Sequence, residues 1–176
     1  MSIQPNGNGY SRRTLVALME DKPGALSFVV NLFRRRNYNI ESLSVGHSET
    51  PGVSRMTVVV NGSDAVVEQV IKQLRKLVNV IKVSDISEDA GVLRELALVK
   101  VHATASTRSE IKQLVDIFRA QIIDVAPESL TAEITGTEDK VDSFIEMLRP
   151  FGLKELTRTG RVAMVRGMLT STASGS

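Results

Sequence analysis

Several residue types that build common functional sites are missing or rare among the 176 residues of this sequence. There is no cysteine, so disulfide bonds, thiolate zinc sites and a cysteine nucleophile are excluded. There is no tryptophan, and two tyrosines and five phenylalanines leave few side chains for stacking the bases of single-stranded nucleic acid. Two histidines offer little for metal binding. No apolar run approaches the roughly 18 residues of a membrane-spanning helix.

The charges nearly cancel, because 22 lysines and arginines are balanced by 20 aspartates and glutamates. A net charge of +2 does not predict a polyanionic partner, so we expect no nucleic acid ligand. Hydrophobic residues make up 42% of the chain and charged residues 24%, which is typical of a soluble globular protein. Polar segments at 1–11 and 170–176 are expected to be disordered tails, and the lack of an apolar stretch in the first of them favours a cytoplasmic location.

The first half of the chain alternates between strand and helix patterns. Short apolar runs bounded by turn residues indicate strands, and apolar residues at helical spacing indicate amphipathic helices. The predicted elements are a strand at 15–19, a helix from 25 to a basic end at 34–37, strands at 40–45 and 56–60, a helix opened by 61–64, and a strand at 80–86.

The second half repeats this order. Phe33 corresponds to Phe118 and Gly62 to Gly136. The second pair is separated by fewer residues than the first, so the second half is shorter between these landmarks. We assign the missing residues to its hairpin loop. The predicted elements are strands at 96–103, 122–125, 129–135, 153–158 and 162–166, with helices at 109–119 and 138–149.

Two βαββαβ units predict an α+β fold of two tandem ferredoxin-like domains. The expected boundaries are 12–87 for the first domain, 88–93 for a linker and 94–169 for the second domain. A sheet with helices on one face leaves the other uncovered, and strands 15–19 and 56–60 are rich in aliphatic residues. We therefore expect this face to meet another sheet, edge or subunit, in a homodimer at least.

The sequence offers no convincing catalytic centre. His47 adjoins Ser48 and Glu49, but neighbouring residues on a strand point to opposite faces and do not converge as a triad requires. His102 lies two residues from Lys100 and has no metal partner. The arginines at 34–36 could bind phosphate, although a solvated helix end explains them better. We expect no catalytic residues and no metal or cofactor in this chain.

The more informative segment runs from Asp21 through Gly24 to Leu26. Pro23 suits the first position of a helix, and Gly24 puts no side chain between its backbone and a ligand. Free N–H groups and the positive end of the helix dipole favour a carboxylate there. Asn39 follows the far end of the helix, and its amide can both donate and accept, as a zwitterionic amino acid requires.

Gly24 and Asn39 lie roughly 20 Å apart along the predicted helix, so a small pocket would need two subunits. The alternative is that these residues merely begin and end a helix, and the spacing alone favours that alternative.

Specific motifs then give the chain a family resemblance. It resembles the regulatory small subunits of acetolactate synthase, and the resemblance extends from about residue 12 to 168. The matching segments are RRRNYNIESL at 34–43, SRMT at 54–57, KQLRKL at 72–77, REL at 94–96, FRAQIIDV at 118–125, RTG at 158–160 and RG at 166–167.

The resemblance implies an N-terminal ACT domain, a C-terminal ACT-like domain and a separate catalytic subunit that uses thiamine diphosphate, Mg²⁺ and FAD. It further implies a non-catalytic role, namely activation of that subunit and feedback inhibition by a branched-chain amino acid, usually valine, bound between two N-terminal domains. The expected effector-binding residues are Asp21, Gly24, Ala25, Leu26, Asn39 and Ile40.

One residue departs from the family pattern, because Asp21 stands where the family commonly has asparagine. Aspartate can also cap a helix, but its charge would lie beside the effector carboxylate, and a tenfold change in affinity is the expected scale. Two other classes stay open, a free-standing amino-acid sensor that controls transcription or another enzyme, and a ferredoxin-like enzyme. The lack of an acid–base cluster disfavours the enzyme.

Overall fold

The computed structural model describes residues 11–87 and 91–167. The tail expected at 170–176, residues 1–10 of the other tail and residues 88–90 of the expected linker lie outside the described residues. The chain divides into two compact units, of which the second covers Leu93–Val162 and the first takes the residues on either side. No helix within the described ranges is long and apolar enough to cross a bilayer.

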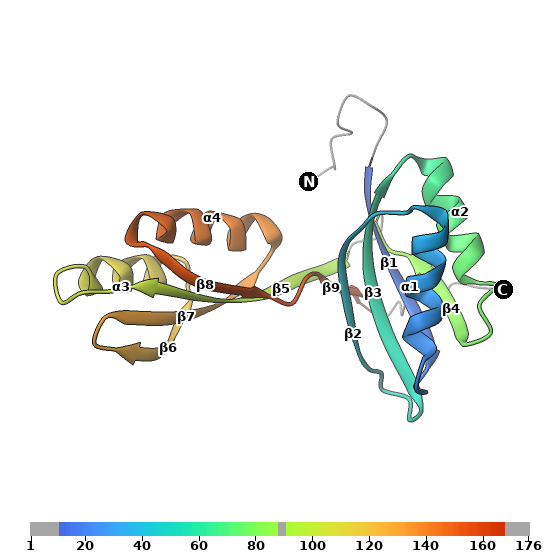
Figure 1. The fold of residues 1–176 in the computed structure, drawn as a ribbon, viewed down its shortest axis with the longest axis horizontal. Helices are drawn as coiled ribbons and strands as arrows, with labels where there is room; N and C mark the ends of the chain where they lie inside the picture. Colours follow the sequence, from blue (N-terminus) through green and yellow to red (C-terminus); the bar gives the residue numbers. More distant parts are fainter. Residues whose placement is uncertain (1–10, 88–90, 168–176) are drawn as a thin grey trace. The chain divides into compact units, whose positions relative to one another are not determined.

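The first unit has the predicted β-α-β-β-α-β order (Figure 1). Its elements are β1 (Ser11–Glu20), α1 (Ala25–Arg36), β2 (Ile40–His47), β3 (Val53–Gly62), α2 (Asp64–Leu74) and β4 (Val80–Asp85). The antiparallel sheet has the strand order β2-β3-β1-β4, and both helices cover one face of it.

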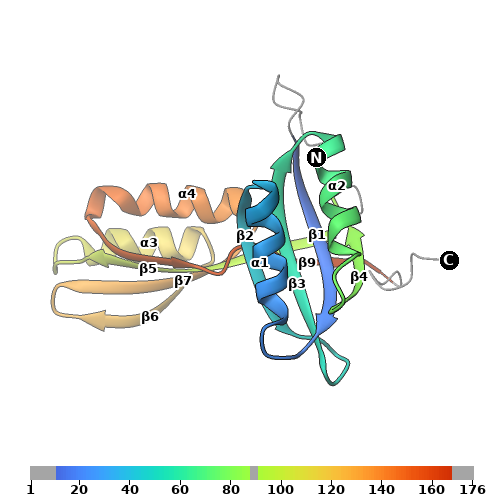
Figure 2. The same ribbon diagram turned by 45° about the vertical axis from the view of Figure 1, so that its right-hand side comes forward.

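The second unit repeats the pattern (Figure 2). Its elements are β5 (Gly91–His102), α3 (Arg108–Ile117), β6 (Gln121–Ala126), β7 (Ser129–Gly136), α4 (Glu138–Leu148), the 3-10 turn η1 (Arg149–Phe151) and β8 (Leu153–Arg158). The strand order is β6-β7-β5-β8, and a last strand, β9 (Val162–Val165), pairs with β5. The predicted α+β fold of tandem ferredoxin-like units is confirmed.

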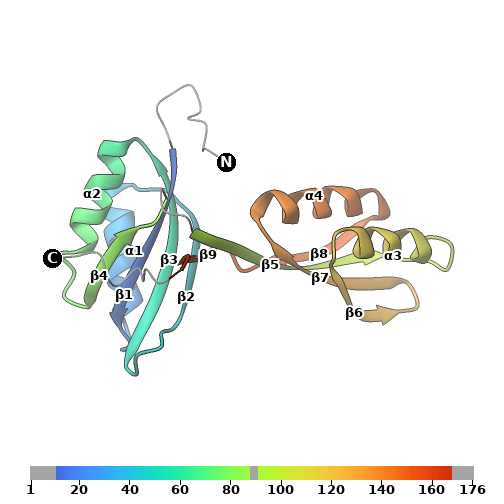
Figure 3. The ribbon, with the colours of Figure 1, turned by 180° about the vertical axis from the view of Figure 1, so that it is seen from behind.

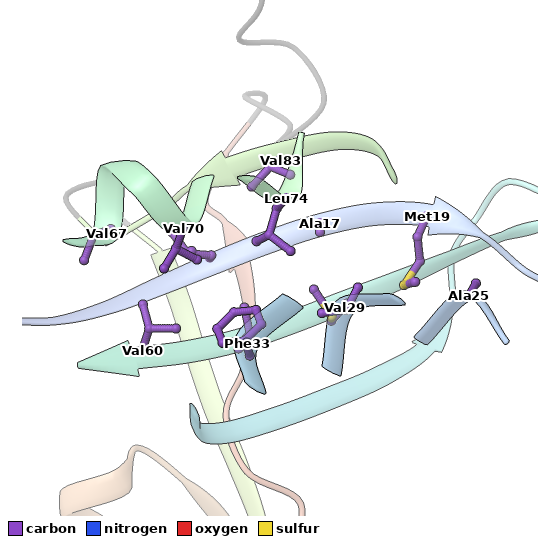
Figure 4. Packing of buried hydrophobic residues seen from close by; sticks show 13 residues of the cluster. Ala17, Met19, Ala25, Val29, Phe33, Val60, Val67, Val70, Leu74 and Val83 are labelled. Carbon is purple, nitrogen blue, oxygen red and sulfur yellow. The ribbon is translucent and has the colours of Figure 1, made fainter. Parts of the chain in front are cut away.

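The core of the first unit lies between its sheet and its helices (Figure 4). Alternate residues of β1 point to one face, so Leu15, Ala17 and Met19 are buried there. On α1, Ala25, Val29 and Phe33 recur every four residues and form the buried stripe that covers them. The spacing of apolar residues therefore fixes which side of α1 stays exposed.

The opposite face of the first sheet is also buried within the unit. Val16 is 2% exposed and Val59 is fully buried, although both point away from the helices. Arg55, on that face of β3, donates a hydrogen bond of 2.9 Å to the carbonyl oxygen of Ala163 in β9, and Figure 3 shows β9 across this side of the sheet. The expectation that the face left by the helices meets another edge is therefore confirmed within the chain, although only part of the aliphatic set at 15–19 and 56–60 lies on it and the rest faces the helices. The expected homodimer stays a prediction.

Candidate functional site

The start of α1 is shaped by a glycine in the left-handed conformation. Gly24 is the N-cap residue, with φ 83° and ψ −9°, and the helix begins at Ala25. The Ala25 N–H donates to the carbonyl oxygen of Lys22 at 3.1 Å, which closes a turn through Pro23 and Gly24. The expectation that Pro23 takes the first helical position is wrong, because this turn holds it outside the helix.

The first turn of α1 leaves backbone donors available. The Ser27 N–H donates to the Gly24 carbonyl oxygen at 3.0 Å, but the N–H groups of Gly24 and Leu26 have no acceptor among the described residues. The first turn contains no acidic side chain, and a Cβ placed on Gly24 would meet no atom within 4 Å. Open space, unpaired donors and the positive end of the helix dipole together favour an anion.

Asp21 does not cap this helix. Its Oδ2 lies 3.0 Å from Nδ1 of His47, and its Oδ1 accepts a hydrogen bond of 3.2 Å from the Ser54 hydroxyl. Its backbone N–H donates to the Gly52 carbonyl oxygen at 2.9 Å. The carboxylate is thus held by the β2–β3 hairpin rather than by the start of α1.

His47 and Ser54 are contacts that the sequence analysis missed. They are directly paired on β2 and β3, and the neighbouring pair of Glu20 with Val53 brings the end of β1 beside them. The sequence could have indicated these contacts. The predicted hairpin, paired with the strand at 15–19 through the strand at 56–60, places both residues near the end of β1.

Leu26 and Ala25 take different environments on α1. Ala25 is 4% exposed in the core, and its N–H is already bonded to Lys22. Leu26 is 38% exposed, and it shares one side of the helix with Val30, which is 44% exposed. Of the two predicted residues, Leu26 is therefore the one whose side chain can contact a ligand.

Asn39 and Ile40 lie at the opposite end of α1. The helix has 12 residues, which separates its ends by about 18 Å, and it closes at Asn37 in the left-handed conformation. Asn39 is exposed, whereas Ile40 is half-buried against the core of the first unit. Within one chain Gly24 and Leu26 therefore share the start of α1, the Asp21 side chain turns to the β2–β3 hairpin, and Asn39 and Ile40 lie at the other end of the helix.

The other candidate residues show no catalytic arrangement. The Ser48 hydroxyl donates to the Thr50 carbonyl oxygen at 3.2 Å within its own turn, so it does not engage His47. Arg34, Arg35 and Arg36 are exposed in the last turn of α1, where positive charge suits the negative end of the helix dipole.

Two family models match the chain. Residues 15–82 match a model described as "AHAS small subunit-like ACT domain", and residues 94–167 match one described as "Small subunit of acetolactate synthase". A protein of Archaeoglobus fulgidus named "Probable acetolactate synthase small subunit" is 57% identical over 156 residues, which are 89% of this chain and 98% of that one.

More distant relatives and a solved structure agree with these matches. The acetolactate synthase small subunit of Mycolicibacterium smegmatis is 49% identical over 160 residues, which are 91% of this chain and 94% of that one. The crystal structure of the small subunit from Thermotoga maritima matches with a TM-score of 0.84 and 45% identity, over 90% of this chain and 99% of that one.

Proposed function

The chain belongs to the family of acetolactate synthase small subunits, and we propose that it activates a catalytic large subunit and confers feedback inhibition by a branched-chain amino acid, with valine as the first candidate. The observation that carries the effector part of this proposal is the start of α1, where Gly24 leaves open space in front of unpaired N–H groups. A carboxylate placed there would accept hydrogen bonds from Gly24 and Leu26 and would lie at the positive end of the helix dipole.

The effector site would be completed by a second copy of the chain. The two ends of α1 are about 18 Å apart and Asn39 follows the far end, so Asn39 is too far from Gly24 of the same chain to close a pocket around a small amino acid. When two α1 helices pack antiparallel about a two-fold axis, the start of each helix lies beside the end of the other. The exposed Leu26 and Val30, one turn apart, give α1 an apolar side for such packing, and Asn39 of the second copy would then bind the effector ammonium.

Selectivity for a branched aliphatic side chain would depend mainly on Leu26. Its side chain is partly exposed beside the predicted carboxylate position, so the effector side chain could pack against it. One methylene group in such a pocket changes affinity by roughly 1–3 kcal/mol, which is enough to separate valine from alanine. Ile40 is committed in part to its own core, so its contribution would be smaller.

Asp21 would tune this site rather than abolish it. Its carboxylate is held by His47 and Ser54, on the hairpin side, instead of facing the helix N–H groups. We therefore expect the site to bind an aliphatic amino acid with an affinity altered by the additional charge.

The chemistry itself would belong to the catalytic subunit, which would carry the thiamine diphosphate, Mg²⁺ and FAD. An amino acid held between two small subunits could change catalysis only as far as its affinity differs between the active and inhibited arrangements of the complex. Stabilising one arrangement of the N-terminal units is therefore the step through which inhibition would act.

The test is to mix the purified chain with its catalytic subunit and measure acetolactate formation with and without valine, leucine and isoleucine. We expect a rise in activity on mixing and a fall on adding at least one of the three amino acids. Titration calorimetry of the small subunit alone measures effector binding separately. An amino acid that binds without changing acetolactate formation would point to a free-standing sensor and contradict the proposal.

A further inference from the structure

The face of the second sheet opposite α3 and α4 carries a row of polar residues, one from each strand. Strand register places Asp124 on β6 beside Thr131 on β7, Thr131 beside Lys100 on β5, and Lys100 beside Glu155 on β8. The neighbours of Thr131 along β7, Leu130 and Ala132, are buried in the core. Figure 2 shows α3 and α4 on one face of this sheet, so the row lies on the face that the helices leave uncovered.

Thr131, in the middle of this row, has an unsatisfied hydroxyl. The residue is only 9% exposed, and its Oγ1 has no hydrogen-bond partner among the described residues. A buried polar atom without a partner costs about 1–3 kcal/mol. An unsatisfied hydroxyl at the floor of an open face indicates that this surface is incomplete in the free chain.

A cavity of about 300 Å³ lies over the row. This volume is at the small end of the range for ligand pockets in proteins. Its lining combines both signs of charge, two hydroxyl groups and one aliphatic side chain. The lining residues are Leu98, Lys100, Asp124, Thr131, Glu155 and Thr157.

The charges in the cavity suit a zwitterion. Nζ of Lys100 lies 2.9 Å from Oε2 of Glu155, and that hydrogen bond, with the negative charges of Glu155 and Asp124, raises the pKa of Lys100, so it stays an ammonium group. The Glu155 side chain is 66% exposed, so replacing it as the partner of Lys100 would cost little. Asp124 remains available for a positive group on the other side of Thr131.

The two ends of the row carry the opposite charges that an α-amino acid needs. Asp124 and Lys100 lie two strand spacings apart, about 10 Å between backbones, on the same face of the sheet. A small ligand with one positive and one negative group can therefore contact both side chains, and Leu98 offers a surface for an aliphatic side chain. A metal ion fits poorly, because the described residues contain no cluster of three or more metal-ligating side chains.

We propose that this cavity is a second amino-acid site, in which Lys100 binds the carboxylate of a small aliphatic amino acid, Asp124 binds its ammonium group and the Thr131 hydroxyl hydrogen-bonds to it. This site goes beyond the proposed function and does not depend on it, since it lies within the second unit and uses none of the residues at the start of α1.

The experiment is an NMR titration of the ¹⁵N-labelled full chain carrying Gly24→Asp, which removes the proposed first site. L-Valine is the probe, and isobutylamine and 3-methylbutanoate are its analogues without the carboxylate and without the ammonium group. We expect saturable shifts of the Lys100, Asp124 and Thr131 amides with valine and at least tenfold weaker binding of either analogue. The absence of saturable shifts at these amides at millimolar valine, or equal binding of an analogue, would overturn the proposal.

Two variants separate a binding role from a structural one. Lys100→Met should weaken valine binding tenfold or more, while Lys112→Met, on the exposed side of α3, should leave it unchanged. Thr131→Val removes the unsatisfied hydroxyl, so it should raise the urea midpoint of the free chain while weakening valine binding about tenfold. Loss of binding in Lys112→Met, or valine affinity that Thr131→Val leaves intact, would contradict the assignment.

Discussion

Replacing Gly24 by aspartate is the sharpest perturbation of the proposed effector site. Gly24 has φ 83°, where an L-residue other than glycine costs about 1–2 kcal/mol. A Cβ there meets no atom within 4 Å, so no steric cost is added. Because domains of this size are stable by about 5–15 kcal/mol, the variant should still fold.

The effect on the effector should be much larger than the effect on folding. The new carboxylate would occupy the space in front of the Gly24 and Leu26 N–H groups and would repel the carboxylate of valine. Two unit charges 4 Å apart interact with about 1 kcal/mol in water and about 4 kcal/mol near a protein surface. Since every 1.4 kcal/mol is tenfold, we expect the valine concentration for half-inhibition to rise at least tenfold.

The assay is acetolactate formation by the mixed subunits as valine is titrated, and activity without valine checks that the variant assembles. Gly167→Asp is a matched control, because Gly167 also has a positive φ of 82° and open space around it. That control should keep the parental inhibition curve. If Gly24→Asp kept the parental curve as well, the placement of the effector carboxylate at the start of α1 would be refuted.

Two further predictions concern stability, measured by urea unfolding. Ser63→Ala should lower stability by about 1 kcal/mol, because the Ser63 hydroxyl accepts a hydrogen bond from the backbone N–H of the residue three positions later, at the start of α2. Thr137→Ala should cost less, because the Thr137 side chain makes no such bond at the start of α4. Arg158→Met should cost about 3 kcal/mol, because it leaves Glu95, whose side chain is 7% exposed, without its partner at 2.5 Å. Arg149→Met removes a partner from an exposed pair and should cost far less. Equal losses within either pair of variants would contradict the reasoning.

The order of elements could be predicted because each is encoded locally. The short apolar run at 15–19 and the four-residue spacing of Ala25, Val29 and Phe33 are signals within a single element. The correspondence of Gly62 with Gly136 has a steric basis as well. A Cβ at Gly62 would lie 2.9 Å from Cγ1 of Val66, and one at Gly136 would lie 2.6 Å from Cδ of Lys140. In each unit the glycine leaves room for a side chain from the first turn of the helix that follows the strand.

Features that depend on contacts between distant segments could not be predicted in the same way. β9 lies more than a hundred residues from β3, and no local pattern indicates that Ala163 accepts a hydrogen bond from Arg55. The environment of Asp21 likewise depends on the pairing of β1 with β3, which brings Ser54 and His47 to it. Sequence spacing located the start of α1, but the left-handed conformation that moves Pro23 out of the helix became visible only in the structure.

A site divided between copies of the chain would tie regulation to assembly. With the two ends of α1 about 18 Å apart, an effector that needs Gly24 and Asn39 together binds only the paired form and stabilises it by mass action. The stabilisation of the paired form grows with the ratio of effector concentration to the effector's dissociation constant. Inhibition has a further requirement, namely that the paired form binds the catalytic subunit in a different way from the unpaired form. Effector affinity and strength of inhibition are therefore separate quantities, and a variant that changes α1 packing could lose inhibition while each half of the binding site stays intact.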